Sequence, residues 1–275
     1  MRPILIIALK EIREGLRNRW VLATTLLLAT LALTLTFLGA APTGGVGASP
    51  LHVVVVTLSS LTVFLVPLIA LLLSHDAIVG EIERGVMLLL LSYPVARWQV
   101  IVGKFVGHLA ILTFATLVGY GLAAATLTAA GENTDPASWK AFGTLIGSSI
   151  ALGAVFLAIG YLVSTLTRER GTAAGIAVGI WLVFVLIYDM ALLGLLVADQ
   201  GRTITSSLLN TLLLLNPTDA YRLLNLEGGA IGVLSGMSGG AKQPSIGSSA
   251  LLAVLAAWIG FPLAAAILAF SRKEL

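Results

Sequence analysis

Residues that could do chemistry are sparse in this chain of 275 residues, of which 58% are hydrophobic and 11% are charged. One acid, Asp189, lies inside a long apolar run and follows Tyr188. A carboxylate at membrane depth costs about 2.5–3.5 kcal/mol on insertion scales, so it should face protein or water. Asp189 and Tyr188 are therefore candidates for groups that line or gate a pathway. The alternative is a structural acid, satisfied by a neighbouring Tyr or Thr hydroxyl.

Two other patterns resemble chemical motifs and lack the partners that the chemistry needs. His75 and Asp76 stand side by side without a nucleophile, and we interpret them as a polar boundary at the end of an apolar run. Gly103-Lys104 is not a phosphate-binding loop, because the first glycine of G-x-x-x-x-G-K-[ST] would stand at Trp98. We therefore expect no catalytic residue and no nucleotide site in this chain.

Composition also argues against a metal site or a bound cofactor. The chain has no Cys, and its four Met and three His residues are scattered along the sequence. Thiolate sites and disulfides are thus excluded, and no cluster of His residues offers the spacing of metal ligands. We expect no metal and no cofactor in this chain.

Long apolar runs must position these residues. Mean hydropathy is +1.02, and the charged fraction is far below the roughly 25% of soluble domains. A bilayer core needs about 20 helical residues. The sequence therefore predicts an all-α polytopic membrane protein, forming one transmembrane domain over residues 1–275. Its six spans are expected at residues 20–41, 51–74, 105–130, 141–167, 171–198 and 250–271.

Small and charged residues add detail to this architecture. Residues 2–19 alternate charged and apolar positions at helical spacing, which predicts an amphipathic helix on the membrane surface rather than a signal peptide. Glycines four residues apart, such as Gly103 and Gly107, indicate close helix packing.

The distribution of positive charge predicts the orientation. If residues 75–104 are cytoplasmic, only four of the 16 Lys and Arg residues lie outside, namely Lys140, Arg202, Arg222 and Lys242. This asymmetry follows the positive-inside rule. We expect a multi-pass protein of the bacterial inner membrane with both termini in the cytoplasm.

The segment 75–104 is the densest charged stretch between two apolar runs. An acidic start is followed by the apolar patch Val86–Leu91, by Pro94, and by Arg97 and Lys104. Such a segment is too short to fold alone and can form an amphipathic helix on the membrane surface, on which a soluble partner could push. A charged turn between two spans is the alternative.

This segment resembles the first cytoplasmic loop of ABC transporter permeases of the six-span type-2 exporter class. The matching pattern is Glu-x-Glu-x-Gly, an apolar run, and Pro-x-x-Arg, although Val86 stands where that class usually has Thr. In that class the loop is a coupling helix that docks on the ATPase subunit. The resemblance thus implies a homodimer with two cytoplasmic ATPase subunits, which would hold ATP and Mg²⁺. It assigns the ATPase-coupling role to Glu81, Glu83, Arg84, Gly85, Pro94 and Arg97.

The outside segment 199–249 is long enough to carry structure. Ser207–Leu215 is apolar and too short to span, which predicts a re-entrant or interfacial piece. Asn216-Pro217-x-Asp219 has the N-cap, first-turn proline and acid of a helix start, which predicts a short helix through Leu226. External helices between the last two spans cap the outer end of the pathway in the exporter class. Residues 228–249 are rich in Gly and are expected to order on a partner.

The stretch Leu212–Asn225 is similar to the permeases of NosDFY-type transporters, which serve maturation of nitrous oxide reductase. The resemblance implies a NosF-like ATPase in the cytoplasm and a periplasmic NosD-like protein on the outer surface. We expect this partner to contact the external helix near Asn216, Asp219, Tyr221 and Arg222. The alternative is that Tyr221 packs on the bilayer interface and Arg222 meets lipid phosphates.

Taken with the resemblance, the sequence predicts a permease subunit required for assembly of the copper–sulfide centre of nitrous oxide reductase. The lack of Cys argues against relay of copper ions, and favours export of a sulfur species or transmission of ATPase-driven motion. One alternative is an exporter of the same class for a lipid, a drug or a haem-related compound. Another is a membrane enzyme, which would need converging acids or His residues within the spans.

Overall fold

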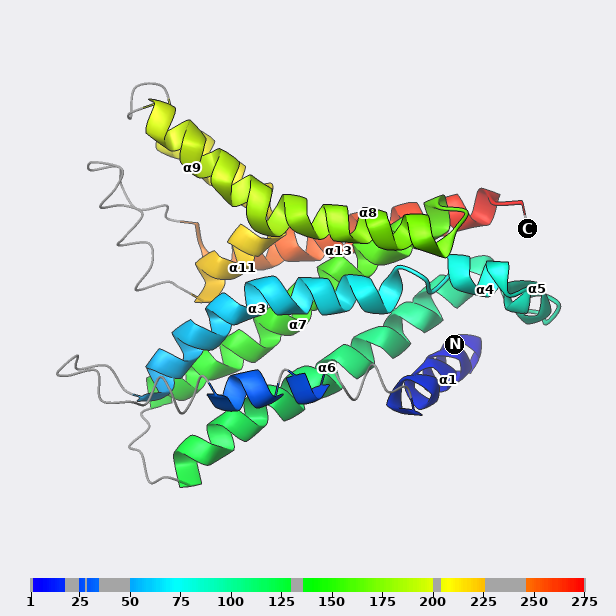
Figure 1. Cartoon of the computed structure of the whole chain (residues 1–275), viewed down its shortest axis with the longest axis horizontal. Helices are drawn as coiled ribbons and strands as arrows, with labels where there is room; N and C mark the ends of the chain where they lie inside the picture. Colours follow the sequence, from blue (N-terminus) through cyan, green and yellow to red (C-terminus); the bar gives the residue numbers. More distant parts are fainter. Residues whose placement is uncertain are drawn as a thin grey trace.

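The structure, a computed structural model, describes residues 2–17, 25–27, 29–34, 50–129, 136–199, 204–225 and 246–274. All regular elements in these ranges are helices (Figure 1). They are α1 (Arg2–Arg17), α3 (Pro50–Ser74), α4 (Val79–Glu83), α5 (Val86–Leu91), α6 (Arg97–Ala129), α7 (Pro136–Leu166), α8 (Arg170–Leu182), the π-helix η1 (Val183–Ile187), α9 (Tyr188–Asp199), α10 (Ser206–Leu214), α11 (Pro217–Asn225) and α13 (Ser248–Arg272).

Five helical stretches are long and apolar enough to cross a membrane, which makes the protein an all-α, multi-pass membrane protein. They occur where the second to sixth apolar runs stand in the sequence. Of the first predicted span, only residues 25–27 and 29–34 are described, and they are helical. Its remainder lies outside the described residues, so the first span, and with it a total of six, stays a prediction. Residues 228–245 of the segment between the last two spans also lie outside the described residues.

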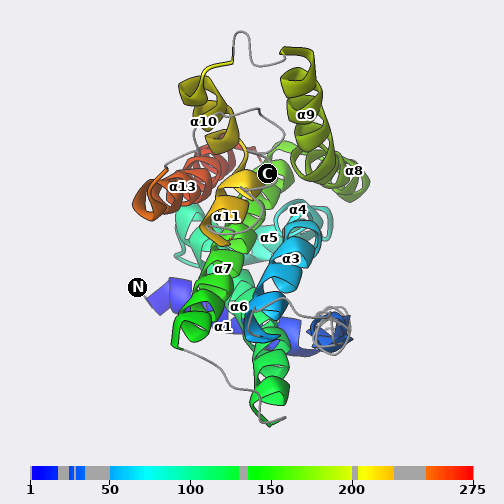
Figure 2. The same ribbon diagram turned by 90° about the vertical axis from the view of Figure 1, so that its left-hand side faces the viewer.

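Helix α7 is the centre of the bundle. It packs against α3, α13, α6 and α11, and Figure 2 shows these helices arranged around it. Its large side chains Leu152, Phe156 and Tyr161 are fully buried. Figure 1 shows α1, α4, α5 and both chain ends at one end of the bundle. Residues 75–104, called the coupling segment below, and the two termini therefore lie at the same end.

Helix α1 crosses α6 at two glycines. A Cβ atom at Gly103 would lie 2.9 Å from the Cβ of Ile7, and one at Gly107 would lie 2.6 Å from the Cβ of Glu11. The close approach predicted from the four-residue spacing is confirmed here. The opposite face of α1 leaves Leu5 and Ile6 exposed, as an amphipathic helix at an interface would.

The coupling segment is not one amphipathic helix. It forms two short helices, α4 and α5, separated by Gly85, whose φ of 71° lies in the left-handed region that favours glycine. Helix α6 begins at Arg97, soon after Pro94, because no helix breaker follows this proline. Lys104, expected at the end of a loop, is therefore part of a helix.

The fifth span is one continuous helical stretch formed by α8, η1 and α9, with a π-turn in its middle. Only 6% of the residues in its most apolar window are buried inside this chain. Its exposed apolar side chains include Ile187, Met190 and Val197. This face must be covered by lipid or by another protein surface.

Candidate functional site

Glu81, expected on the docking surface of the coupling segment, is buried. Its Oε1 accepts hydrogen bonds from Lys104 Nζ at 2.7 Å and from Lys10 Nζ at 3.2 Å. Glu81 therefore holds α4 to α6 and α1 and does not face a soluble partner, which corrects its expected position.

The same network extends further into the bundle. Lys104 Nζ also donates to Glu11 Oε1 at 2.8 Å, and Glu11 Oε2 lies 3.4 Å from His108 Nε2. His108 Nδ1 lies 2.8 Å from the hydroxyl of Tyr161. Burial alone would raise the pKa of Glu11, but the hydrogen bond to His108 and the charge of Lys104 outweigh burial and lower this pKa. We call Lys10, Glu11, Glu81, Lys104 and His108 the inner charge cluster.

The inner charge cluster was missed from the sequence as a site. Its signal was present, because Lys104 and His108 stand at the start of an apolar run, where unpaired charges are costly. Their partners come from residues far away in the chain, which no local spacing reveals.

Glu83 and Arg84 remain at the surface of the coupling segment. Glu83 Oε1 accepts the backbone N–H of Arg170 at 2.8 Å, at the start of α8. Arg170 also pairs with Asp76 at 3.0 Å, so Asp76 serves an ion pair at a helix junction. Ser164 Oγ accepts the backbone N–H groups of Ile78 and Val79 at 3.0 and 3.1 Å and caps the start of α4.

Arg97 binds the end of α13. Its Nη1 donates to the carbonyl oxygens of Phe270, Ser271 and Lys273 at 3.0, 3.2 and 2.6 Å, and its guanidinium lies 5.8 Å from the centre of the Phe270 ring. A cation is favourable at a helix C-terminus, where carbonyl groups lack partners. The structure thus gives Arg97 a contact inside the chain, while Pro94 is exposed.

The coupling segment does present an apolar surface. The exposed side chains Val86, Leu88, Leu89, Tyr93 and Trp98 come from α5, the turn after it and the start of α6. Leu89 is 69% exposed. We call these five residues the α5 patch.

Asp189 on α9 is paired with a guanidinium rather than with a hydroxyl group. Its Oδ2 lies 2.5 Å from Nη1 of Arg222 on α11, and the same nitrogen donates to Asp219 Oδ1 at 3.0 Å. Tyr188 donates its hydroxyl to the carbonyl oxygen of Leu212 at 2.6 Å. Asp189 and Tyr188 therefore join the fifth span to helices α10 and α11.

A second contact joins α11 to this span at the π-helix. Asn216 Nδ2 and Thr218 Oγ1 both donate to the carbonyl oxygen of Phe184, at 3.0 and 3.2 Å. Asn216 Oδ1 also accepts the backbone N–H of Thr218 at 3.1 Å, which confirms its predicted role as N-cap. The first turn of α11 is thus bound to η1.

Tyr221 does not stand on the outer surface. Its side chain is fully buried, and its hydroxyl lies 3.3 Å from Ser149 Oγ on α7. Asn225, one turn later, donates to Ser148 Oγ at 2.8 Å. Helix α11 packs into the bundle against α3, α7 and α13, because its apolar side faces them. The expected contact of the Tyr221 side chain with a periplasmic partner is therefore corrected.

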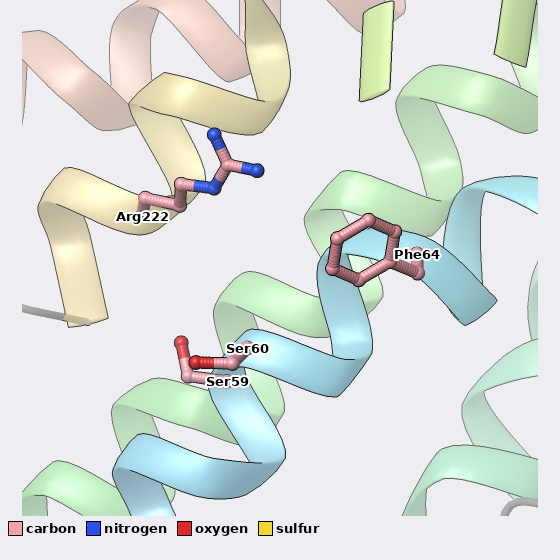
Figure 3. Close-up of a pocket in the computed structure, with 4 residues that line it drawn as sticks. All are labelled: Ser59, Ser60, Phe64 and Arg222. Carbon is pink, nitrogen blue, oxygen red and sulfur yellow. The ribbon is translucent and has the colours of Figure 1, made fainter. Parts of the chain in front are cut away.

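Arg222 also lines a cavity of about 220 Å³, together with Ser59, Ser60 and Phe64 of α3 (Figure 3). Within the described part of the chain, Ser59 Oγ and Asp219 Oδ2 are buried without a hydrogen-bond partner. Burial and the negative charge of Asp189 raise the pKa of Asp219 to about 6. Among the residues that the structure describes, no cluster of three His, Cys, Asp or Glu could hold a metal ion.

Known proteins resemble this chain over nearly its whole length. The family model described as "ABC-2 family transporter protein" matches residues 5–275. A protein of Pseudomonas aeruginosa, "Probable ABC transporter permease protein NosY", is 48% identical over 270 residues, covering 98% of each chain. A protein of the same name from Stutzerimonas stutzeri is 46% identical over 276 residues, covering 99% of each chain.

Proposed function

The chain belongs to the ABC-2 transporter family, and from this premise we propose that it is the permease subunit of a NosDFY-type transporter. This transporter would be required for assembly of the copper–sulfide centre of nitrous oxide reductase. The observation that carries the proposal is the identity of 46–48% with two permeases named NosY over nearly the full length of each chain.

The α5 patch is the docking surface proposed for a cytoplasmic, NosF-like ATPase, which would bind ATP and Mg²⁺. Glu83, Arg84 and Gly85 stand beside this patch, at the turn between α4 and α5. A protein interface of this kind buries large apolar and aromatic side chains at its centre. Glu81 takes a different part, since it fixes α4 to the bundle so that a push on α5 moves α6 and α1 as well.

The fifth span is the surface proposed for pairing with a second copy of the chain. It is apolar and almost unburied within one chain. A homodimer would enclose a pathway between the two copies, and the Asp189–Arg222 pair would fasten the outer end of this span to α11. Export of a sulfur species, or transmission of ATPase-driven motion to a periplasmic NosD-like protein, is the task proposed for the pathway.

The orientation proposed for the protein places α1, α4, α5 and both termini in the cytoplasm of a bacterium, with α10 and α11 at the periplasmic side of the inner membrane. This orientation is supported by the positive-inside bias of the sequence, and by the position of both chain ends beside the coupling helices.

Deletion of the gene, followed by complementation, tests the proposal. We expect the deletion strain to produce nitrous oxide reductase that lacks the copper–sulfide centre, as measured by its visible absorption and copper content. Complementation with the wild-type gene should restore the centre. A complete centre in the deletion strain would contradict the proposal and favour an exporter of the same class with another cargo.

A further inference from the structure

The cavity beside Arg222 has polar groups that the packing of the chain leaves unused. Ser59 is 1% exposed, and its Oγ makes no hydrogen bond within the described ranges, although the hydroxyl of Tyr221 lies near it. Buried polar atoms in folded proteins nearly always have a partner, so an orphaned hydroxyl that lines a cavity points to a ligand. Ser60, next in sequence, is different because its hydroxyl donates to the carbonyl oxygen of Val56 at 3.0 Å.

Arg222 supplies the charge at this cavity. Both of its ion pairs, with Asp189 and Asp219, use Nη1. A guanidinium has five N–H donors in a planar fork, so the donors on Nη2 and Nε are left over from these pairs. Figure 3 shows Arg222 on α11 and Ser59, Ser60 and Phe64 on α3, on two sides of the same space.

We propose that this cavity binds a small anionic group, held by the free guanidinium donors of Arg222 and the hydroxyl of Ser59. Phe64 forms an apolar wall. A volume of about 220 Å³ suits a compact anion of a few heavy atoms or the head of a larger molecule. Binding of an anion at this site does not depend on the proposed function, whereas the use of the site for transported cargo rests on it.

The charges around the cavity couple binding of the anion to protonation of Asp219. With both carboxylates ionised, Asp189, Asp219 and Arg222 carry a net negative charge, which would repel an anion. The ionisable groups that interact with Asp219 are Arg222 on α11 itself and Asp189 and Tyr188 on α9. Of the two acids, Asp219 has the orphaned oxygen, Oδ2. Protonation of Asp219 leaves one carboxylate paired with Arg222. The three groups then carry no net charge, so they no longer repel an anionic ligand.

Binding of radiolabelled thiosulfate to the full-length chain, purified with its ATPase in nanodiscs of zwitterionic lipid, tests this inference. We expect wild-type binding to be roughly tenfold tighter at about pH 5.5 than at about pH 7.5, because the pKa of Asp219 lies near 6. Asp219→Asn, which mimics the protonated acid, should bind at the higher pH as the wild type does at the lower. An equally strong pH dependence in this variant would overturn the coupling.

Two matched comparisons test the site itself. Arg222→Gln made together with Asp189→Asn removes the ion pair as a unit and should weaken binding roughly tenfold or more. Ser59→Ala should weaken it roughly fivefold, whereas Ser60→Ala should not change it, since only the hydroxyl of Ser59 is free. Binding that is equal in the wild type, the double variant and Ser59→Ala would overturn the site.

The anion could also be a lipid headgroup, and a second arm separates this source. Phosphatidylglycerol in the nanodisc should displace thiosulfate only if the cavity takes lipid phosphate. Binding of either anion, dependent on Arg222, supports the site, and binding of neither overturns it. If the double variant loses binding but still matures nitrous oxide reductase, the site stands and its ligand is not the cargo. The proposed function is tested separately by the gene deletion.

Discussion

Lys104 shows how a single side chain can join helices that are distant in sequence. Its ammonium group is buried and lies between carboxylates of α1 and α4, with His108 one turn further along α6. Two lysines and two glutamates balance the charge of the inner charge cluster. Removing one partner from a buried ion pair leaves an uncompensated charge, which costs far more than the pair contributes.

We therefore predict that Lys104→Met lowers the free energy of unfolding by about 3–5 kcal/mol. Thermal unfolding of the purified protein in detergent would measure this change. Lys10→Met is the matched control, since Lys10 contacts the same Glu81 but its side chain is 40% exposed. Its loss should cost less than about 1 kcal/mol. Equal losses in the two variants would contradict a buried, mutually dependent cluster.

At the scale of elements, the crossing of α1 and α6 depends on the absence of side chains. A Cβ at Gly107 would meet the backbone oxygen of Ala8 at 3.0 Å as well as Glu11. Backbone atoms cannot rotate aside as a flexible side chain can. The two helices would have to separate, and the Glu11–Lys104 contact would lengthen with them.

Gly107→Ala is therefore predicted to destabilise the protein by about 1–3 kcal/mol through overpacking. Gly121→Ala on the same helix is the control, because nothing lies within 4 Å of a Cβ at that position. It should be neutral or slightly stabilising, as alanine favours the helix. Unfolding curves of both variants, recorded side by side, would check this order, and a Gly121 variant that is the less stable would refute it.

The helices that apolar composition dictates could be predicted from the sequence, whereas the arrangement of polar residues between them could not. The runs that became α3, α7 and α13 are recognisable because lipid requires continuous apolar helices. The burial of Glu81 and Tyr221 depends on partners contributed by other helices. The π-helix η1 has no composition of its own, since VFVLI would fit any apolar helix. The N-cap at Asn216 was predictable because capping is a local pattern.

At the scale of the whole molecule, two surfaces of the described residues remain for partners. The α5 patch lies at the end of the bundle that carries both termini, and the fifth span lies along one side of it. Each surface leads to a separate prediction.

Leu89→Asp should release the ATPase subunit while the permease still inserts into the membrane. The side chain is 69% exposed, so the charge costs nothing in the free subunit, but it would be buried in the proposed interface. Co-purification on a tagged permease would measure retention, with Arg13→Gln at an exposed position of α1 as a control that changes the net charge by the same amount. Full retention in the Leu89 variant would place the docking surface elsewhere.

Because the chain has no Cys, a single introduced thiol can report pairing of two copies. Met190→Cys, at a position that is 72% exposed on α9, should form a disulfide-linked dimer under mild oxidation if the fifth spans pair. Phe114→Cys, also exposed but on α6, should stay monomeric. Dimer bands of equal strength would indicate random collisions in the membrane. They would argue against pairing through α9.

The π-turn at η1 determines which side chains of α9, the second half of the fifth span, face the rest of the bundle. A π-turn accommodates one more residue than an α-turn, and each residue of an α-helix rotates the following side chains by about 100°. Inserting one alanine between Ile187 and Tyr188, next to a π-turn that already holds an extra residue, should rotate Asp189 by about 100° away from Arg222, although every residue of the ion pair is still present. We expect this insertion to resemble loss of the pair, with weaker thiosulfate binding than in a deletion of Leu186, which removes only the extra residue of the π-turn and keeps Asp189 facing Arg222. The rotation of α9 about its own axis thus decides whether Asp189 can reach Arg222.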